Sequence, residues 1–296
     1  MPEGYLQEMK SQKFGIEIEF SFITREDAKG IIREVLSNDA MLDSSGRRWK
    51  VVRDGSIIAR KRDSSGTVVS ADDSYKVELN SPILGYEDLE LLAEVVAALR
   101  KAGAKASGLC GIHIHVGEEG HTVRSLRNML NLFMQKEAVM AEAFQISKER
   151  RSQYCRDVCE GLIAEMNRHK ARTLKQLEKQ WEREDCDRYR MLNLSSFYSN
   201  KGIEFRLFNS TLEHSAIRAY IIFCLAMSQK AKTMHRAVPI KSRMENNRYE
   251  WRNFLNRLGL AGGEFKAVRK ELLRHVSGDS AFHVPEAHNR KRVHTE

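Results

Sequence analysis

The 296-residue chain is 42% hydrophobic and 30% charged, which are the proportions of a globular protein that buries a sizeable core. No apolar run approaches the roughly 20 residues that cross a bilayer, and the first residues lack the form of a signal peptide, so the sequence predicts a cytoplasmic protein without a membrane partner. The net charge of +9 would suit an anionic ligand, but the basic residues are dispersed and no RNA-binding or zinc-finger motif accompanies them, so a nucleic-acid partner is not expected.

The first predicted element is a strand over residues 14–20, FGIEIEF, after an irregular lead-in over residues 1–12. Apolar and acidic residues alternate with the period of a β-strand, so Glu17 and Glu19 share one face. Carboxylates at this spacing lie about 6.5–7 Å apart at Cα and repel each other unless a cation lies between them. A solvated acidic face is the simpler interpretation of this stretch alone. The pattern recurs, however, and the recurrence favours a site.

A capped helix and further strands are predicted next. Thr24 followed by an acid three residues later is typical of a helix start, and the apolar spacing after it extends for about a dozen residues. Two polar turns separate short strands, and Asp54 lies in an Asp-Gly turn at the end of one of them. Residues 76–82 then predict a strand with Glu78 on its polar face.

A helix over residues 86–101 leads to a second strand of the recurring type. Residues 111–116, GIHIHV, place His113 and His115 on one face and apolar residues on the other. Thr122 then caps a helix whose apolar side is expected to pack under the sheet.

Residues 147–188 are strongly charged and mostly helical in pattern. They predict an insertion into the domain, either a solvated hairpin of helices or a lid. No motif in this insertion indicates a function.

A hairpin is predicted after the insertion, with one strand over residues 190–197 and the other over residues 202–208. The second strand, GIEFRLF, repeats the alternation with an acid and a base. Neighbouring strands in this hairpin would bring Arg190 or Asn193 close to Glu204 or Arg206.

The last predicted elements are helices. The most apolar one runs from residue 213 to about residue 236 and is expected under the sheet, and two shorter helices over residues 247–275 are separated by a Gly-Gly pair. The basic tail, 277–296, is expected to be mobile. Together the elements predict one catalytic domain over residues 1–276, an α+β fold with a mainly antiparallel sheet, helices on one face and an open polar face on the other.

The polar face of such a sheet would collect groups that bind metals or phosphates: Glu17, Glu19, Glu78, His113, His115, Glu204 and Arg206. These ligands would serve two divalent cations, and the arginine would serve a transferring phosphoryl group. Mg²⁺ prefers oxygen ligands, and Mn²⁺ can replace it where an imidazole takes part. The five scattered cysteines argue against a disulfide framework and leave a zinc site without a second pair of ligands.

Six stretches in this order resemble the amidoligase family, which is related to the carboxylate–amine ligases on the glutamine synthetase catalytic fold, including glutamate–cysteine ligases. The resemblance covers roughly residues 13–235 and rests on the following stretches: 15–20, 54–56, 78–82, 111–116, 190–194 and 202–207. It implies a sheet of the glutamine synthetase type and ATP-dependent amide formation through an acyl phosphate.

The resemblance also implies roles for single residues. Glu17, His113 and Glu204 would hold the metal that bridges the ATP phosphates. Glu19 and Glu78 would hold the metal nearer the acid substrate. The catalytic residues would be Glu17 and Glu204 together with Arg206, which would stabilise the transferring phosphoryl group. The residues expected to contact nucleotide or substrate are His115, Asp54, Arg190 and Asn193.

Three other functions stay open from the residues. A guanidino-kinase-like phosphotransferase shares this kind of sheet and would form ADP without an amide. A metal-dependent hydrolase would hold Zn²⁺ or Fe²⁺ and ignore ATP. A non-catalytic nucleic-acid binder would show steeply salt-dependent binding. The partners expected for a ligase are an acid and an amine, for example an amino acid or a peptide, and the sequence neither requires nor excludes a homo-oligomer.

Overall fold

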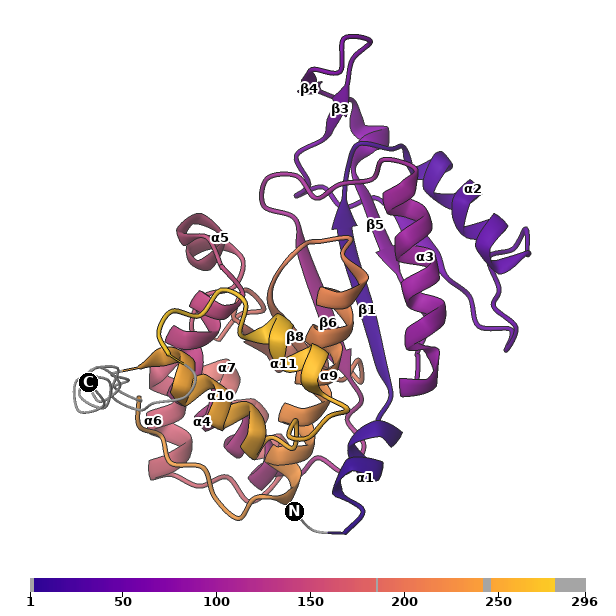
Figure 1. Cartoon of the computed structure of the whole chain (residues 1–296). Coiled ribbons are helices and arrows are strands. Elements are labelled where there is room, and N and C mark those ends of the chain that lie inside the picture. Colours follow the sequence, from indigo (N-terminus) through magenta and orange to yellow (C-terminus); the bar gives the residue numbers. More distant parts are fainter. Residues whose placement is uncertain (1–2, 185, 242–245, 280–296) are drawn as a thin grey trace, which may run out of the picture.

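The computed structural model describes residues 3–184, 186–241 and 246–279. Within these residues the main sheet has six strands, each antiparallel to its neighbours, in the order β2-β5-β1-β6-β8-β7 (Figure 1). The strand bounds are β1 (Phe14–Phe20), β2 (Lys50–Val52), β5 (Val77–Asn80), β6 (Gly111–Val116), β7 (Leu192–Asn193) and β8 (Ile203–Asn209). A hairpin of β3 (Arg60–Arg62) and β4 (Val68–Ser70) projects from one end of the molecule. The predicted antiparallel α+β organisation is confirmed.

Helices occupy the connections between these strands. They are α1 (Tyr5–Ser11), α2 (Arg25–Leu36), α3 (Leu89–Lys101), α4 (Val123–Ala143), α5 (Lys148–Gln153), α6 (Glu160–Arg168), α7 (Leu174–Arg183), α8 (Ser195–Tyr198), α9 (His214–Thr233), α10 (Asn247–Arg257) and α11 (Lys266–Leu272), with 3₁₀ turns at Asp73–Tyr75 and Tyr86–Asp88. None of the described helices combines the length and the apolar character needed to span a bilayer.

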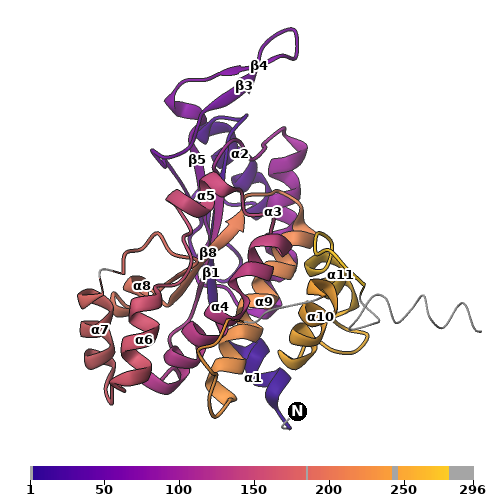
Figure 2. The ribbon, with the colours of Figure 1, turned by 90° about the vertical axis from the view of Figure 1, so that its left-hand side faces the viewer.

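The core lies between the apolar face of the sheet and α9. The apolar row of β1, Ile16, Ile18 and Phe20, is almost completely buried because every second residue of a strand points to the same side. Helix α9 contacts β6 as well as α1, α3, α4 and α11. Figure 2 shows α9, α10 and α11 to the right of the strands and α6, α7 and α8 to the left, with α6 packed against α4. The polar row of β1 therefore faces away from α9.

The expected lead-in over residues 1–12 is wrong in one respect, because residues 5–11 form helix α1. Tyr5 and Met9 are one helical turn apart and both are buried. The Tyr5 hydroxyl donates a hydrogen bond to the carbonyl oxygen of Leu258 at 2.9 Å. Contacts with a segment distant in sequence therefore stabilise a short helix that its own residues only weakly favour.

The predicted strand over residues 190–197 is also shorter than expected, since β7 contains only Leu192 and Asn193. The Asn193 side-chain oxygen accepts a hydrogen bond from the backbone N–H of Ser195 at 2.8 Å, and the Ser196 hydroxyl donates to the carbonyl oxygens of Asn193 and Gly202. These bonds turn the chain into α8. The predicted antiparallel pairing with β8 is confirmed, with Asn193 opposite Glu204.

The charged insertion forms α5, α6 and α7 and is helical as predicted. It is not a purely solvated excursion, because Arg150 in α5 is only 2% exposed. The two short C-terminal helices, α10 and α11, are confirmed on either side of the Gly-Gly pair. Most of the predicted mobile tail, residues 280–296, lies outside the described residues.

Candidate active site

Five neighbouring strands place polar side chains on the face of the sheet opposite α9. The register sets Glu17 opposite His113 and Glu19 opposite Glu78. It also sets Glu204 between residues of β6 and β7, opposite both His115 and Asn193. The sheet thus brings together residues that lie up to 187 positions apart in the sequence, as between Glu17 and Glu204.

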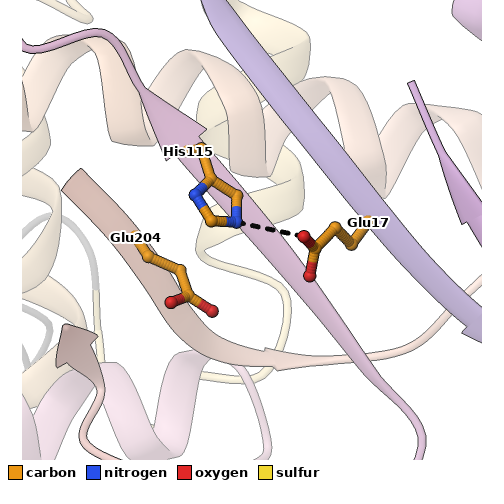
Figure 3. A group of neighbouring side chains, drawn as sticks. All are labelled: Glu17, His115 and Glu204. Atoms are coloured by element: carbon orange, nitrogen blue, oxygen red, sulfur yellow. Dashed lines mark ion pairs between the residues drawn. The ribbon is translucent and has the colours of Figure 1, made fainter. Parts of the chain in front are cut away.

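One group on this face consists of Glu17, His115 and Glu204 (Figure 3). Each offers one ligand atom, and these atoms lie within 4.8 Å of one another. The Nε2 atom of His115 lies 3.4 Å from a Glu17 carboxylate oxygen, and its Nδ1 atom lies 3.1 Å from the Lys201 carbonyl oxygen. Because a carbonyl oxygen can only accept, Nδ1 carries the proton and the Nε2 lone pair points toward the carboxylate when the ring is neutral.

The Nε2 atom of His115 is buried and has no hydrogen-bond partner among the described residues. Two acceptors that face each other in this way need either a proton or a cation between them. An imidazole that donates its other N–H to a carbonyl is the usual form of a metal-binding histidine. The donor set therefore fits a divalent cation.

A second group consists of Glu19, Asp54 and Glu78, whose ligand atoms also lie within 4.8 Å of one another. Burial and the charges of Glu17, Glu19 and Asp54 raise the pKa of Glu78 to about 8. Burial also raises the pKa of Glu19, whose carboxylate accepts a hydrogen bond from the backbone N–H of Gly111 at 2.7 Å. Negative charge is in excess here, and oxygen ligands of this kind suit Mg²⁺ or Mn²⁺.

His113 links the two groups. Its Nδ1 atom lies 3.1 Å from a Glu17 oxygen and 3.8 Å from a Glu204 oxygen, and its Nε2 atom lies 3.7 Å from a Glu19 oxygen. Burial by itself would raise the pKa of Glu17, but the adjacent imidazoles of His113 and His115 lower it below its ordinary value. Glu17 is therefore held as a carboxylate.

Glu204 is fixed by two donors. The side-chain amide of Asn193 donates to one carboxylate oxygen at 2.6 Å, and Nη1 of Arg206 donates to the other. Arg206 is buried, its guanidinium lies over the ring of Tyr189, and its Nε has no partner among the described residues. Its positive charge therefore lies beside the first group, and its Nε–H can still donate a hydrogen bond to a ligand.

A cavity opens at each end of this row of residues. The first, of about 370 Å³, adjoins Glu19, Asp54 and His113 and is otherwise lined mainly by arginines and tyrosines: Arg53, Arg150, Arg188, Arg206, Tyr154 and Tyr189. The second, of about 420 Å³, adjoins His115 and has largely apolar walls that include Phe14 and Ile83. Lys13 and Lys201 lie at the second cavity.

The expected site residues thus share one face, apart from Arg190. Nη1 of Arg190 donates to the backbone carbonyl oxygen of Asp157 at 3.1 Å, and its side chain does not line the first cavity. No sequence pattern predicts five residues of the first cavity: Arg53, Arg150, Arg188, Tyr154 and Tyr189. These residues belong to no recurring pattern, and four of them lie in or just after the charged insertion, where charge indicates solvent exposure.

The family model described as "Putative amidoligase enzyme" matches residues 10–228 of this chain. No curated protein sequence matches it. Among solved structures, the crystal structure of a bifunctional glutathione synthetase from Pasteurella multocida aligns with 12% sequence identity and a TM-score of 0.39. That alignment covers 99% of this chain and 50% of the synthetase, so the chain spans about half the length of that protein. A TM-score of this size is too low to show a shared fold.

Proposed function

The chain belongs to the amidoligase family, and we propose that it joins a carboxylic acid to an amine at the expense of ATP, on a catalytic sheet of the glutamine synthetase type. One observation carries this proposal. Two groups of cation ligands lie on one face of the sheet, His113 touches carboxylates of both, and a cavity opens on either side. Such an arrangement suits a nucleotide and an acid that meet between two cations.

The proposed cation ligands are Glu17, His115 and Glu204 in the first group and Glu19, Asp54 and Glu78 in the second, with the imidazole of His113 between the two. Mg²⁺ or Mn²⁺ bound there would neutralise charge on the ATP phosphates and on the acid. The apolar cavity beside His115 would receive the base of the nucleotide, with Lys13 and Lys201 available to its phosphates. The arginine-lined cavity beside Glu19 would then receive the acid.

The reaction would proceed in two steps. A carboxylate oxygen of the acid attacks the γ-phosphorus of ATP, and the bond between that phosphorus and the β,γ-bridging oxygen breaks. The acid becomes an acyl phosphate, and ADP is released. The amine nitrogen then attacks the carbonyl carbon, the bond to the phosphate oxygen breaks, and the nitrogen loses a proton to phosphate or solvent. The products are an amide, ADP and phosphate.

Arg206 and Asn193 have positions that suit supporting roles in the first step. The Arg206 guanidinium, buried beside Glu204, would stabilise negative charge on the phosphoryl group during its transfer. Asn193 would hold the Glu204 carboxylate in one orientation. Arg190 receives no role, because it donates to the backbone of Asp157.

The test is a screen of amino acids, peptides and amines for ADP release with ATP and Mg²⁺ or Mn²⁺, followed by mass spectrometry of the product. A ligase gives a product whose mass equals acid plus amine minus water. Glu204→Gln should lower substrate-dependent ADP release by a factor of about 100 or more with an unchanged circular dichroism spectrum. Glu26→Gln on α2, which is exposed, is the matched control and should keep full activity.

Two results would contradict the proposal. Full activity of Glu204→Gln would separate the reaction from this face of the sheet. ADP release that yields a phosphorylated guanidine, with no loss of water, would show phosphoryl transfer alone.

A further inference from the structure

Arg150 is a buried cation whose hydrogen-bond partners are all neutral. It lies in α5 of the charged insertion and is 2% exposed. Its guanidinium donates to the carbonyl oxygens of Leu109 at 3.3 Å and of Arg206 at 3.1 Å, and it approaches the sulfur of Cys155. No carboxylate oxygen of the described residues lies within 4.0 Å of its nitrogens. A buried charge that no counter-ion contacts is costly, so its position needs an explanation.

The guanidinium reaches the polar face of the sheet through a gap at Gly111. A Cβ atom at residue 111 would overlap Nη2 of Arg150 and would lie 3.2 Å from Nε2 of His113. Arg150 therefore lies against β6 beside the histidine that joins the two cation groups. Its side chain lines the first cavity together with Arg53, Arg188 and Arg206.

Two of the other three arginines of this cavity already pair with a carboxylate of the chain. Arg53 donates to Asp73 at 2.8 Å, and Arg206 donates to Glu204. Arg188 is exposed at the same cavity and donates to the hydroxyl of Tyr189 at 3.1 Å, with no carboxylate partner among the described residues. Two positive charges, on Arg150 and Arg188, are thus left without an ion pair.

The acids that face this cavity cannot serve both the arginines and a cation. Glu19 and Asp54 are the acidic residues of its lining, and both belong to the second group of cation ligands. Once a divalent cation occupies that group, it compensates their charge. The positive charge of Arg150 and Arg188 then requires an anion from outside the chain.

We infer that the acid substrate carries, in addition to the carboxylate that reacts, a second anionic group, and that Arg150 binds this group with help from Arg188. This inference rests on the proposed function and adds a class of substrate to it. The reacting carboxylate lies near Glu19, Asp54 and Glu78, and the second group lies at the arginines. A cavity of about 370 Å³ accommodates a small acid of this kind. The second anion is a carboxylate or a phosphate, since a guanidinium binds both in the same forked geometry.

The experiment measures binding by calorimetry in the presence of Mg²⁺ and a non-hydrolysable ATP analogue. The probes are the dicarboxylates from succinate to adipate, each compared with its half-amide, which has the same shape and one charge fewer. Phosphonobutanoate tests whether the second anion is instead a phosphate. At least one doubly anionic probe should bind about tenfold or more tightly than its half-amide. Arg150→Met should abolish most of this preference for the doubly anionic probe, while the affinity for the nucleotide analogue stays unchanged. Arg150→Lys, which keeps a positive charge, should retain part of the preference.

Arg151→Met is the matched control, because the neighbouring Arg151 pairs with Asp157 at 2.6 Å, outside the first cavity, and its loss should leave binding unchanged. If Arg150→Met does not fold, Arg188→Met tests the same inference from an exposed position and should weaken the dianions about threefold. Half-amides that bind as well as every dianion, or dianion binding that survives both substitutions, would overturn the inference. Failure of the proposed function is a separate result, since it appears as ADP release that does not depend on Glu204.

Discussion

His113 lies directly opposite Glu17 in the β1–β6 pair, with its Nδ1 atom 3.1 Å from a carboxylate oxygen of that residue. The other nitrogen of the same ring lies 3.7 Å from Glu19, which belongs to the second acidic group. One imidazole therefore separates two sets of carboxylates that would otherwise repel each other across the strand. The two sets should behave as neighbouring but distinct cation sites.

The first prediction concerns the number of cations. Wild-type protein should bind two Mn²⁺ ions per chain, one for each group of ligands, as measured from the loss of the free Mn²⁺ signal in electron paramagnetic resonance. Glu78→Gln should reduce the number to one, because it removes a ligand of the second group only. Glu204→Gln should remove the other ion. Glu94→Gln, on the exposed side of α3, is the control. Retention of both ions by Glu78→Gln would show that Glu78 is not a ligand of the second ion.

Much of this face could be predicted from the sequence, because each strand carries its own period of two. The alternation in residues 14–20 is enough to put Glu17 and Glu19 on one side of a strand. The register between strands is a different matter. The pairing of His113 with Glu17 depends on how β1 and β6 align, and the place of Asp54 beside Glu19 and Glu78 depends on how β2, β5 and β1 align. No single strand contains that information.

Arg150 could not be predicted for a related reason. In the sequence it is one charge among many in a helical insertion, and such charges usually face solvent. Its burial follows from the absent side chain at Gly111 and from backbone carbonyls at Leu109 and Arg206, all distant in sequence. Helix α1 is a parallel case, since Tyr5 is held by a carbonyl of residue 258. Tertiary contacts, rather than local propensity, decided both positions.

The second prediction concerns Gly202, which precedes β8. Its φ of +76° is a left-handed conformation, and a Cβ atom there would overlap the carbonyl oxygen of Val116 in β6. Gly202→Ala should therefore lower the free energy of unfolding by about 2–4 kcal/mol in a urea titration, because backbone cannot move aside as a flexible side chain can.

The control for Gly202 is a glycine without either constraint. Gly30 lies inside α2, and a Cβ atom there would meet nothing within 4 Å. Gly30→Ala should raise the free energy of unfolding by about 0.5–1 kcal/mol, since alanine is the better helix former. Equal stability of the two variants would show that the contact at Val116 is relieved by a small shift of β8.

The third prediction concerns the start of α2. The Thr24 hydroxyl accepts a hydrogen bond from the backbone N–H of Asp27 at 3.1 Å, and the Asp27 carboxylate accepts from the backbone N–H of Thr24 at 3.0 Å. Thr24→Ala removes one half of this capping box and should cost about 1 kcal/mol in urea unfolding. Thr24→Ser keeps a hydroxyl in the same place and should lie close to wild type. A loss of the same size in both variants would point to the methyl group instead.

The last prediction concerns His121, which is buried between two serines at the start of α4. Its ring nitrogens lie 3.0 Å from the Ser125 hydroxyl and 2.9 Å from the Ser228 hydroxyl. Burial, with a smaller contribution from the positive charge of Lys232, lowers the pKa of His121 to about 3. The folded protein therefore keeps this ring neutral at pH values where an unfolded chain, with a histidine pKa of about 6.5, already binds a proton.

The sign of the effect follows from this difference in proton binding. Below about pH 6.5 the unfolded state binds more protons at this position than the folded state, so the free energy of unfolding falls as the pH falls, by about 1.4 kcal/mol per unit, until about pH 3. Above about pH 6.5 the residue contributes no pH dependence. Between about pH 6.5 and about pH 5, wild type should lose about 2 kcal/mol more than His121→Gln, which has no group to protonate. Urea titrations at these pH values measure the difference, and His214→Gln, at an exposed position, should follow wild type. A His121→Gln curve parallel to that of wild type would mean that the ring is protonated equally in both states.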